Sequence, residues 1–262
     1  MEGGAASTIL SPVVVTVRAP RQGRCTMAND EWSRPTTEQL THAKSQALLA
    51  LQTERSGWRL RRYYDTAGDY AGASFATIGT NDASVIAADD LFAVTLLSVS
   101  IPAGAARLLT EPGGSSDTVN EALRALPTES LRDVEDGGLR DMETFYRRVK
   151  AALAKAGVEN SNPWVTASKL CARKRPDLLP VRDNVVCALL GLLPKGNYQV
   201  DWQVFRHLMR DQEVLDAIEA AAETAMQDAD GTLVVIDREP LRILDAALWC
   251  SVIMPDRVEA TA

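Results

Sequence analysis

The sequence has few of the residues that build metal sites and disulfide frameworks. Among 262 residues there are only two histidines, His42 and His207, and no pair of cysteines has C-x-x-C spacing. Structural zinc sites need several closely spaced Cys and His ligands, so we expect no metal. Widely separated cysteines are typical of reduced thiols in a cytosolic protein. The four cysteines are Cys25, Cys171, Cys187 and Cys250.

Long apolar runs and nucleotide-binding motifs are also lacking. No segment reaches the roughly 18 uninterrupted apolar residues that a membrane span needs, and the first residues lack the basic and apolar regions of a signal peptide. The sequence has no P-loop, no dinucleotide Gly-x-Gly-x-x-Gly, no Gly-x-Ser-x-Gly elbow and no His-Glu-x-x-His. We expect a soluble, cytoplasmic protein with no membrane contact and no cofactor.

Aromatic residues make up only 5% of the chain, while alanine is abundant. Alanine favours helices, and strands prefer aromatic and β-branched residues, so this composition predicts an all-α fold. The formal net charge is −7. A molecule of that charge repels polyanions as a whole, and a contact with nucleic acid therefore needs a local basic patch.

Residues 1–30 differ from the rest. They are rich in Gly, Ser, Ala and Pro and show no helical period, so we expect a flexible N-terminal tail followed by one helical domain over 31–262. Apolar periodicity, capping residues and breaks predict helices over most of that domain. They are expected at 36–51, 58–64, 87–97, 102–109, 117–126, 140–156, 164–173, 182–192, 201–209, 212–227 and 240–253, with a short strand at 232–236 and an irregular region at 65–80.

The most informative segment is WVTASKLCARKRPDLLPVRDNVV, residues 164–186. It carries five cations within 14 residues, and one acid, Asp177, lies among them. Pro176 disfavours helix at the residue before it, and Pro180 precedes a second helix. We therefore predict a helix, a basic turn and another helix. The five cations are Lys169, Arg173, Lys174, Arg175 and Arg182.

Two interpretations of this basic turn remain open. Lysines and arginines between two helices can hold the phosphates of DNA or RNA. Charge runs are also commonly solvated or paired with the protein's own acids. Asp183 has a structural reading of its own, because an Asp at a helix start is well placed to cap that helix or to pair with Arg182 or Lys169.

Four segments carry a family resemblance. YYDTAGDYAGASF (63–75), AADDLFAVTLLSV (87–99), ASKLCARKRPDLLPVRDNVV (167–186) and LRILDAALW (241–249) resemble an actinobacterial family of unknown function. That resemblance covers about residues 30 to 255 and implies a shared fold and shared motifs, but no established activity.

A second, more distant resemblance implies a mechanism. A helix with Lys, then Pro-Val, then Asp, then a later Arg-x-x-acid-x-x-Leu-Trp is similar to helix-hairpin-helix proteins of the 8-oxoguanine DNA glycosylase type. Those enzymes break a base–sugar bond with an Asp, often aided by a Lys nucleophile. The resemblance implies that Asp183 is the catalytic carboxylate and that Lys169 is a nucleophile or phosphate contact. Trp164 and Trp202 are then the nearest aromatic candidates for contacting a flipped base.

Other residues have competing readings. Tyr63, Tyr64 and Tyr70 lie near a basic run and either stack bases or form a buried aromatic edge. Arg242 and Asp245 are three apart, which is typical of a helix surface pair. Trp249 lies on an apolar helix face and is expected in the core.

Composition and periodicity predict an all-α fold, and the second resemblance implies a helix-hairpin-helix, glycosylase-like bundle. The predicted function is binding of nucleic acid, with DNA as the partner and DNA bases as the substrate. In this reading Arg173, Lys174, Arg175, Arg182 and Trp164 contact the nucleic acid. The alternative is a non-catalytic interaction module whose basic turn docks an acidic partner. A small-molecule enzyme with an anionic substrate on the same cations is a third reading.

Overall fold

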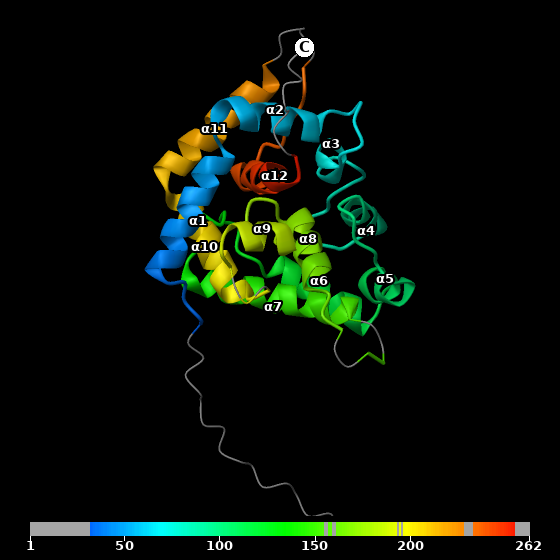
Figure 1. Cartoon of the computed structure of the whole chain (residues 1–262). Coiled ribbons are helices and arrows are strands. Elements are labelled where there is room, and N and C mark those ends of the chain that lie inside the picture. Colours follow the sequence, from blue (N-terminus) through cyan, green and yellow to red (C-terminus); the bar gives the residue numbers. More distant parts are fainter. Residues whose placement is uncertain are drawn as a thin grey trace, which may run out of the picture. The chain divides into compact units, whose positions relative to one another are not determined.

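Twelve α-helices and no β-strand make up the described part of the chain in this computed structural model, which is residues 32–254 without 155, 156, 159, 160, 193, 195 and 228–232. Figure 1 shows how these helices are arranged in space. They are α1 (Thr37–Ala50), α2 (Thr53–Tyr64), α3 (Gly72–Phe75), α4 (Ala88–Thr95), α5 (Ala103–Thr110), α6 (Gly114–Arg124), α7 (Asp136–Leu153), α8 (Trp164–Lys174), α9 (Asn184–Leu189), α10 (Tyr198–Arg210), α11 (Gln212–Met226) and α12 (Pro240–Ile253).

Side-chain caps fix the starts of several helices. Thr36 and Gln39 form a capping box at α1, in which each side chain accepts a hydrogen bond from the other residue's backbone N–H. Asp183 caps α9 and Asp211 caps α11. Pro240 opens α12, where its fixed φ suits the first helical position. These caps satisfy backbone groups that each helix leaves without an internal partner.

Helix α12 lies in the interior. It packs against α1, α2, α9 and α11, and nine of its fourteen residues are buried. A helix that is apolar on every side is typical of a protein core. Two of the buried residues are charged, Arg242 and Asp245, with exposures of only 3% and 6%. Charges in such a position need partners or a function, because burial of a charge is costly.

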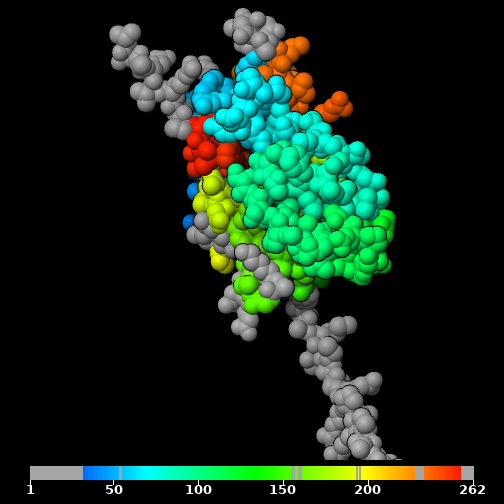
Figure 2. Space-filling view, turned by 90° about the vertical axis from the view of Figure 1, so that its right-hand side faces the viewer, coloured from blue at the N-terminus to red at the C-terminus, as the bar shows by residue number. Residues whose placement is uncertain are grey.

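Other helix pairs hold the rest of the fold together. Helices α2 and α11 make the closest pairing, and Gly57 of α2 permits it, since a Cβ there would collide with the side chain of Thr224. Helices α6 and α8 both pack on α7, and α4 packs on α8. Figure 2 shows the face that the cyan and green segments from α2 to α6 cover.

The all-α prediction is confirmed, and most helices begin within a few residues of the expected positions. The strand prediction at 232–236 is wrong, because residues 233–236 form no strand; residue 232 lies outside the described part. The segment 65–80 contains the short helix α3. The predicted flexible tail, residues 1–30, also lies outside the described part. None of the helices described is long and apolar enough to cross a membrane.

Candidate functional site

The basic segment forms the predicted helix, turn and helix, and two side chains fix the path of the turn. Ser168 of α8 donates a hydrogen bond to the carbonyl of Pro180 and accepts one from the N–H of Arg182. Arg242 of α12 donates to the carbonyls of Pro176 and Leu179. Helices α8 and α12 therefore hold the turn from two sides and set the position of the α9 start.

Arg173 and Lys174 at the end of α8 are turned inward. Lys174 donates to Asp90 of α4 at 2.6 Å, and the side chains of both residues are fully buried. Arg173 lies 3.3 Å from the other oxygen of Asp90 and also donates to the carbonyls of Phe75, Ala76 and Ile78. Burial lowers the pKa of Lys174, and Asp90 opposes that effect. These two cations fasten α4 and the segment before it to α8.

Arg182 is also enclosed. Its side chain has no exposed surface and contacts Asp201 of α10 at 2.7 Å. Its guanidinium group lies 5.2–5.7 Å from the ring centres of Tyr146, Trp164 and Trp202, a distance typical of cation–π contacts. Burial raises the pKa of Asp201 to about 6, and Arg182 opposes that effect. Trp164 and Trp202 thus pack around an internal ion pair.

Arg175 is half-buried and bonds to its own turn. Its guanidinium group contacts both oxygens of Asp177, at 3.0 and 2.9 Å, and it donates to the carbonyls of Pro127 and Glu129. The structure therefore gives no support to a phosphate-binding role for Arg173, Lys174 or Arg182. It places Trp164 in the core. The physical reason is that the acids Asp90 and Asp201 come from distant helices and neutralise the turn from inside.

Lys169 points from α8 in a different direction. Its Nζ donates to the carbonyl of Leu97 at 2.7 Å, just beyond the end of α4. Burial lowers the pKa of Lys169, and Asp183 opposes that effect. The adjacent Ser98 has φ of 59°, which is uncommon for a residue other than glycine. Lys169 therefore holds a strained turn in place and keeps its amine at the wall of a cavity.

Asp183 uses only one of its oxygens for capping. Its Oδ1 accepts hydrogen bonds from the N–H groups of Val185 and Val186, each at 2.9 Å. Its Oδ2 has no hydrogen bond to any residue in the described part of the chain. Asp183 lines the same cavity as Lys169, so the capping role and a free carboxylate oxygen coexist.

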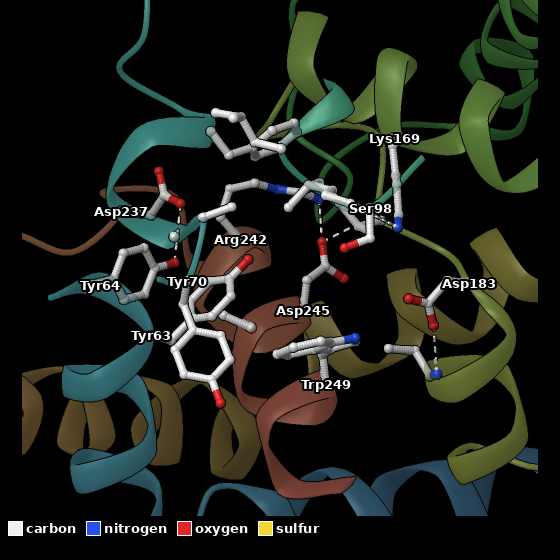
Figure 3. Close-up of a pocket in the computed structure, with 18 of the residues that line it drawn as sticks. Tyr63, Tyr64, Tyr70, Ser98, Lys169, Asp183, Asp237, Arg242, Asp245 and Trp249 are labelled. Atoms are coloured by element: carbon white, nitrogen blue, oxygen red, sulfur yellow. Dashed lines mark hydrogen bonds and ion pairs between the residues drawn. The ribbon is translucent and has the colours of Figure 1, made fainter. Parts of the chain in front are cut away.

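That cavity has a volume of about 420 Å³, within the range of small-molecule sites. Figure 3 shows Lys169 and Asp183 on one side of it and Asp237 and Tyr64 on the other. Its wall carries four carboxyl groups and two cations, so the cavity favours neutral or cationic ligands over anions. The carboxyl groups belong to Asp69, Asp183, Asp237 and Asp245, and the cations are Lys169 and Arg242.

Aromatic rings form one wall of the cavity. Tyr63, Tyr70 and Trp249 lie within 5.8–6.3 Å of one another, centre to centre, at angles of 45–77°. Gly72 makes this arrangement possible, because a Cβ there would collide with the ring of Tyr63. Rings in such positions offer faces on which a planar ligand can stack.

The carboxyl groups of Asp237 and Asp245 lie in a strongly desolvated part of the wall. Asp237 accepts a hydrogen bond from the hydroxyl of Tyr64 at 3.0 Å, and burial raises its pKa. Asp245 Oδ2 accepts from the N–H of Val181 at 2.9 Å and from Arg242 Nη2. Burial raises the pKa of Asp245 to about 7, and Arg242 opposes that effect. A carboxyl group that titrates near neutral pH is typical of functional sites.

The structure thus brings Lys169 and Asp183 to one cavity and leaves the five predicted nucleic-acid contacts outside it. Three residues that the sequence left open between base stacking and a buried aromatic edge also line the cavity, namely Tyr63, Tyr64 and Tyr70. Sequence reasoning assigned Arg242 and Asp245 to a helix surface pair and Trp249 to the core. The pair exists, but it is buried, and all three residues line the cavity. Their spacing on α12 was the available signal, since positions 242, 245 and 249 share one helix face.

One comparison with known proteins gives a match. The profile of a family described as a family of unknown function (DUF6308) matches residues 57–252. The matched region contains every residue that lines the cavity. No curated protein and no solved structure matches the chain.

Proposed function

Because the chain belongs to that family of unknown function, we propose its function from the cavity. The protein binds a planar nitrogenous base in this cavity and cleaves the N-glycosidic bond between the base and its sugar. The observation that carries this proposal is the meeting of Lys169 and Asp183 at an aromatic-walled cavity. The distant glycosylase resemblance, a prediction from the sequence, implies the same two residues.

The charges in the cavity fit this reaction. As the C1′–N bond breaks, its electron pair leaves with the base and positive charge develops on the sugar. The free Oδ2 of Asp183 can stabilise that charge, and a fixed carboxylate in a desolvated site does so strongly. A water molecule then adds its hydroxyl to C1′, and its proton goes to the departing base.

Lys169 offers a second route through the same bond cleavage. Burial lowers the pKa of Lys169, which favours the neutral, nucleophilic amine. Attack of that amine on C1′ replaces the C1′–N bond with a bond to Lys169. One amine proton goes to the departing base. Cleavage of the C1′–O4′ bond, with protonation of O4′, then gives a sugar imine on Lys169. Water later hydrolyses this imine, and borohydride reduction traps it. The two routes are therefore separable by experiment.

The base can come from DNA or from a free nucleoside. DNA is the partner that the sequence predicts, but the turn cations Arg173, Lys174 and Arg182 are buried in the fold. An N-glycoside in DNA and one in a free nucleoside share the chemistry that the cavity would recognise. The experiment therefore uses both, as labelled oligonucleotides with altered bases and as free nucleosides.

The test is a single-turnover cleavage assay with the full chain and the variant Asp183→Asn. Asparagine caps helices about as well as aspartate, so the fold is retained while the negative charge is lost. We expect a rate loss of at least about 100-fold. Lys169→Gln keeps a donor for the Leu97 carbonyl and abolishes borohydride trapping if the amine route operates. Cleavage that is unchanged in Asp183→Asn contradicts the proposal.

The second candidate is a protein that binds a ligand in this cavity without catalysis. It is favoured by the structural tasks that both residues perform, since Lys169 bonds Leu97 and Asp183 caps α9. Base binding without cleavage of any substrate would select this candidate. The sequence-based alternative, in which the basic turn docks an acidic partner, has less support because most of the turn's cations are internally paired.

A further inference from the structure

Two buried polar atoms in the cavity wall have no partner in the described part of the chain. They are Nη1 of Arg242 and Oδ1 of Asp245. Both residues are more than nine-tenths buried, and each is charged in its ordinary form. A buried polar atom without a partner costs free energy, so a site that leaves two of them together calls for an explanation.

The geometry of the pair explains why both atoms are left over. Arg242 and Asp245 touch through a single contact, between Nη2 and Oδ2. Asp245 Oδ2 also accepts from the Val181 N–H, and Arg242 Nη2 also donates to the Leu179 carbonyl. Backbone groups of the turn thereby occupy Oδ2 of Asp245 and Nη2 of Arg242. A two-bond fork between the groups, which would pair Nη1 with Oδ1, does not form.

The second carboxylate oxygen of Asp245 belongs to a cavity-lining residue and does not face Arg242. Figure 3 shows one oxygen of Asp245 directed at Arg242 and the other directed away from it, on the side of Trp249. Asp245 and Trp249 are four apart on α12 and share a helix face. A ring that stacks near Trp249 would therefore present its edge to Asp245.

We infer that Arg242 Nη1 and Asp245 Oδ1 form a donor–acceptor edge that selects a planar ring carrying a carbonyl next to a ring N–H, a cyclic lactam. Arg242 donates to the carbonyl and Asp245 accepts from the N–H. The inference rests on the proposed binding of a base in this cavity and names its chemical class. Purine and pyrimidine lactams have this edge.

Charge assistance makes this edge selective. A hydrogen bond with an ionised partner is stronger than one between neutral groups, and both partners here belong to ionisable side chains. A ring that lacks the N–H leaves Asp245 Oδ1 buried and unpaired, which a site built around that bond rejects strongly. Methylation of the lactam nitrogen removes the donor and leaves the rest of the ring unchanged.

The test measures the affinity of the full chain for two matched probe pairs by calorimetry at pH 8. The pairs are hypoxanthine with 1-methylhypoxanthine and 4-pyrimidinone with 3-methyl-4-pyrimidinone. Both ring sizes are sampled, and neither methylated base has a carbonyl next to a ring N–H. We expect at least one unmethylated base to bind about tenfold or more tightly than its methylated partner. Equal affinities within both pairs, or no binding of any probe, overturns the inference.

Two variants locate the effect. Asp245→Asn places a donor or a weaker acceptor at the free position and should reduce the preference for the unmethylated base to about twofold or less. Asp237→Asn alters a cavity oxygen that already bonds Tyr64, and it should keep the preference. Unfolding temperatures of both variants show whether the fold is retained. A preference that survives in Asp245→Asn overturns the inference even if the wild-type chain discriminates.

The inference and the proposed function fail separately. Discrimination in the binding assay without cleavage of any N-glycoside leaves the inference standing and contradicts the proposed reaction. Cleavage without discrimination between methylated and unmethylated bases supports the proposed reaction and overturns the inference.

Discussion

Lys174 Nζ lies 2.6 Å from Asp90 Oδ2, and the side chains of both residues are fully buried. These residues are far apart in the sequence, and their contact joins α8 to α4. The pair determines what the basic turn can do, because a cation used to hold two helices together is not available to a polyanion.

The variant Lys174→Glu should therefore lower the free energy of unfolding. It should not remove a nucleic-acid contact, because Lys174 is buried. It replaces a buried cation with an acid beside Asp90, and breaking a buried pair costs about 3–5 kcal/mol. Urea denaturation measures the loss. The matched control is Arg147→Glu, because Arg147 is largely exposed and forms only a surface pair, so about 1 kcal/mol or less is expected. A stable Lys174→Glu protein that has lost DNA binding would contradict this reading of the turn.

Asp183 allows capping and chemistry to be separated with two substitutions. Asp183→Ala removes the cap of α9 and should cost about 0.5–2 kcal/mol, whereas Asp183→Asn should cost only a few tenths. Both remove the carboxylate charge and should reduce cleavage equally. Thermal unfolding and single-turnover rates are measured on the same preparations. If Asp183→Asn cleaves as fast as the wild type and only the less stable Asp183→Ala is slower, Asp183 serves only as a helix cap.

The raised pKa values of Asp245 and Asp201 predict how stability depends on pH. Burial raises them to about 7 and about 6, against about 3.9 for an aspartate in an unfolded chain. Between these values the folded protein binds more protons than the unfolded chain, so the free energy of unfolding decreases as pH rises. This contribution is fully present below about pH 4 and is lost by about pH 7.

Asp245→Asn should remove the part of that slope that Asp245 causes. Urea denaturation of the wild type and the variant at four pH values between about 4.5 and 7.5 measures the two slopes. We expect the variant to lose less stability than the wild type as pH rises. Parallel slopes would show that Asp245 does not titrate differently in the folded and unfolded states.

Tyr70 should contribute to ligand affinity more than to folding. It is only half-buried, and its ring lies 6.2 Å from that of Trp249 at the cavity. Stacking of a base on an aromatic side chain is worth about 1–3 kcal/mol, so Tyr70→Ala should weaken base binding about fivefold or more. Calorimetry gives the affinity and thermal unfolding gives the stability. Weaker folding with unchanged affinity would place the ligand elsewhere.

Local signals in the sequence predicted the helices well. Thr36 with Gln39 and Pro240 with the apolar run that follows it mark helix starts by short-range chemistry, and the structure has both. The isolated strand prediction failed because a short apolar run has no strand nearby to pair with. The helix-hairpin-helix arrangement stays a prediction.

The site was only partly predictable because its contacts join distant segments. The sequence shows that Lys169 and Asp183 are close along the chain, but it does not show that Asp90 and Asp201 neutralise the neighbouring cations. Nor does it show that α12 turns Arg242 and Asp245 toward a cavity. Burial decides these roles, and burial depends on tertiary packing.

The most direct test of the account is a crystal structure of Asp183→Asn with a nucleoside of the best-bound base. We expect a planar ring in the cavity near Tyr70 and Trp249, with its lactam edge at Asp245 Oδ1 and its sugar beside residue 183. A cavity that contains only water, or a nucleoside bound at another place on the protein, would contradict it.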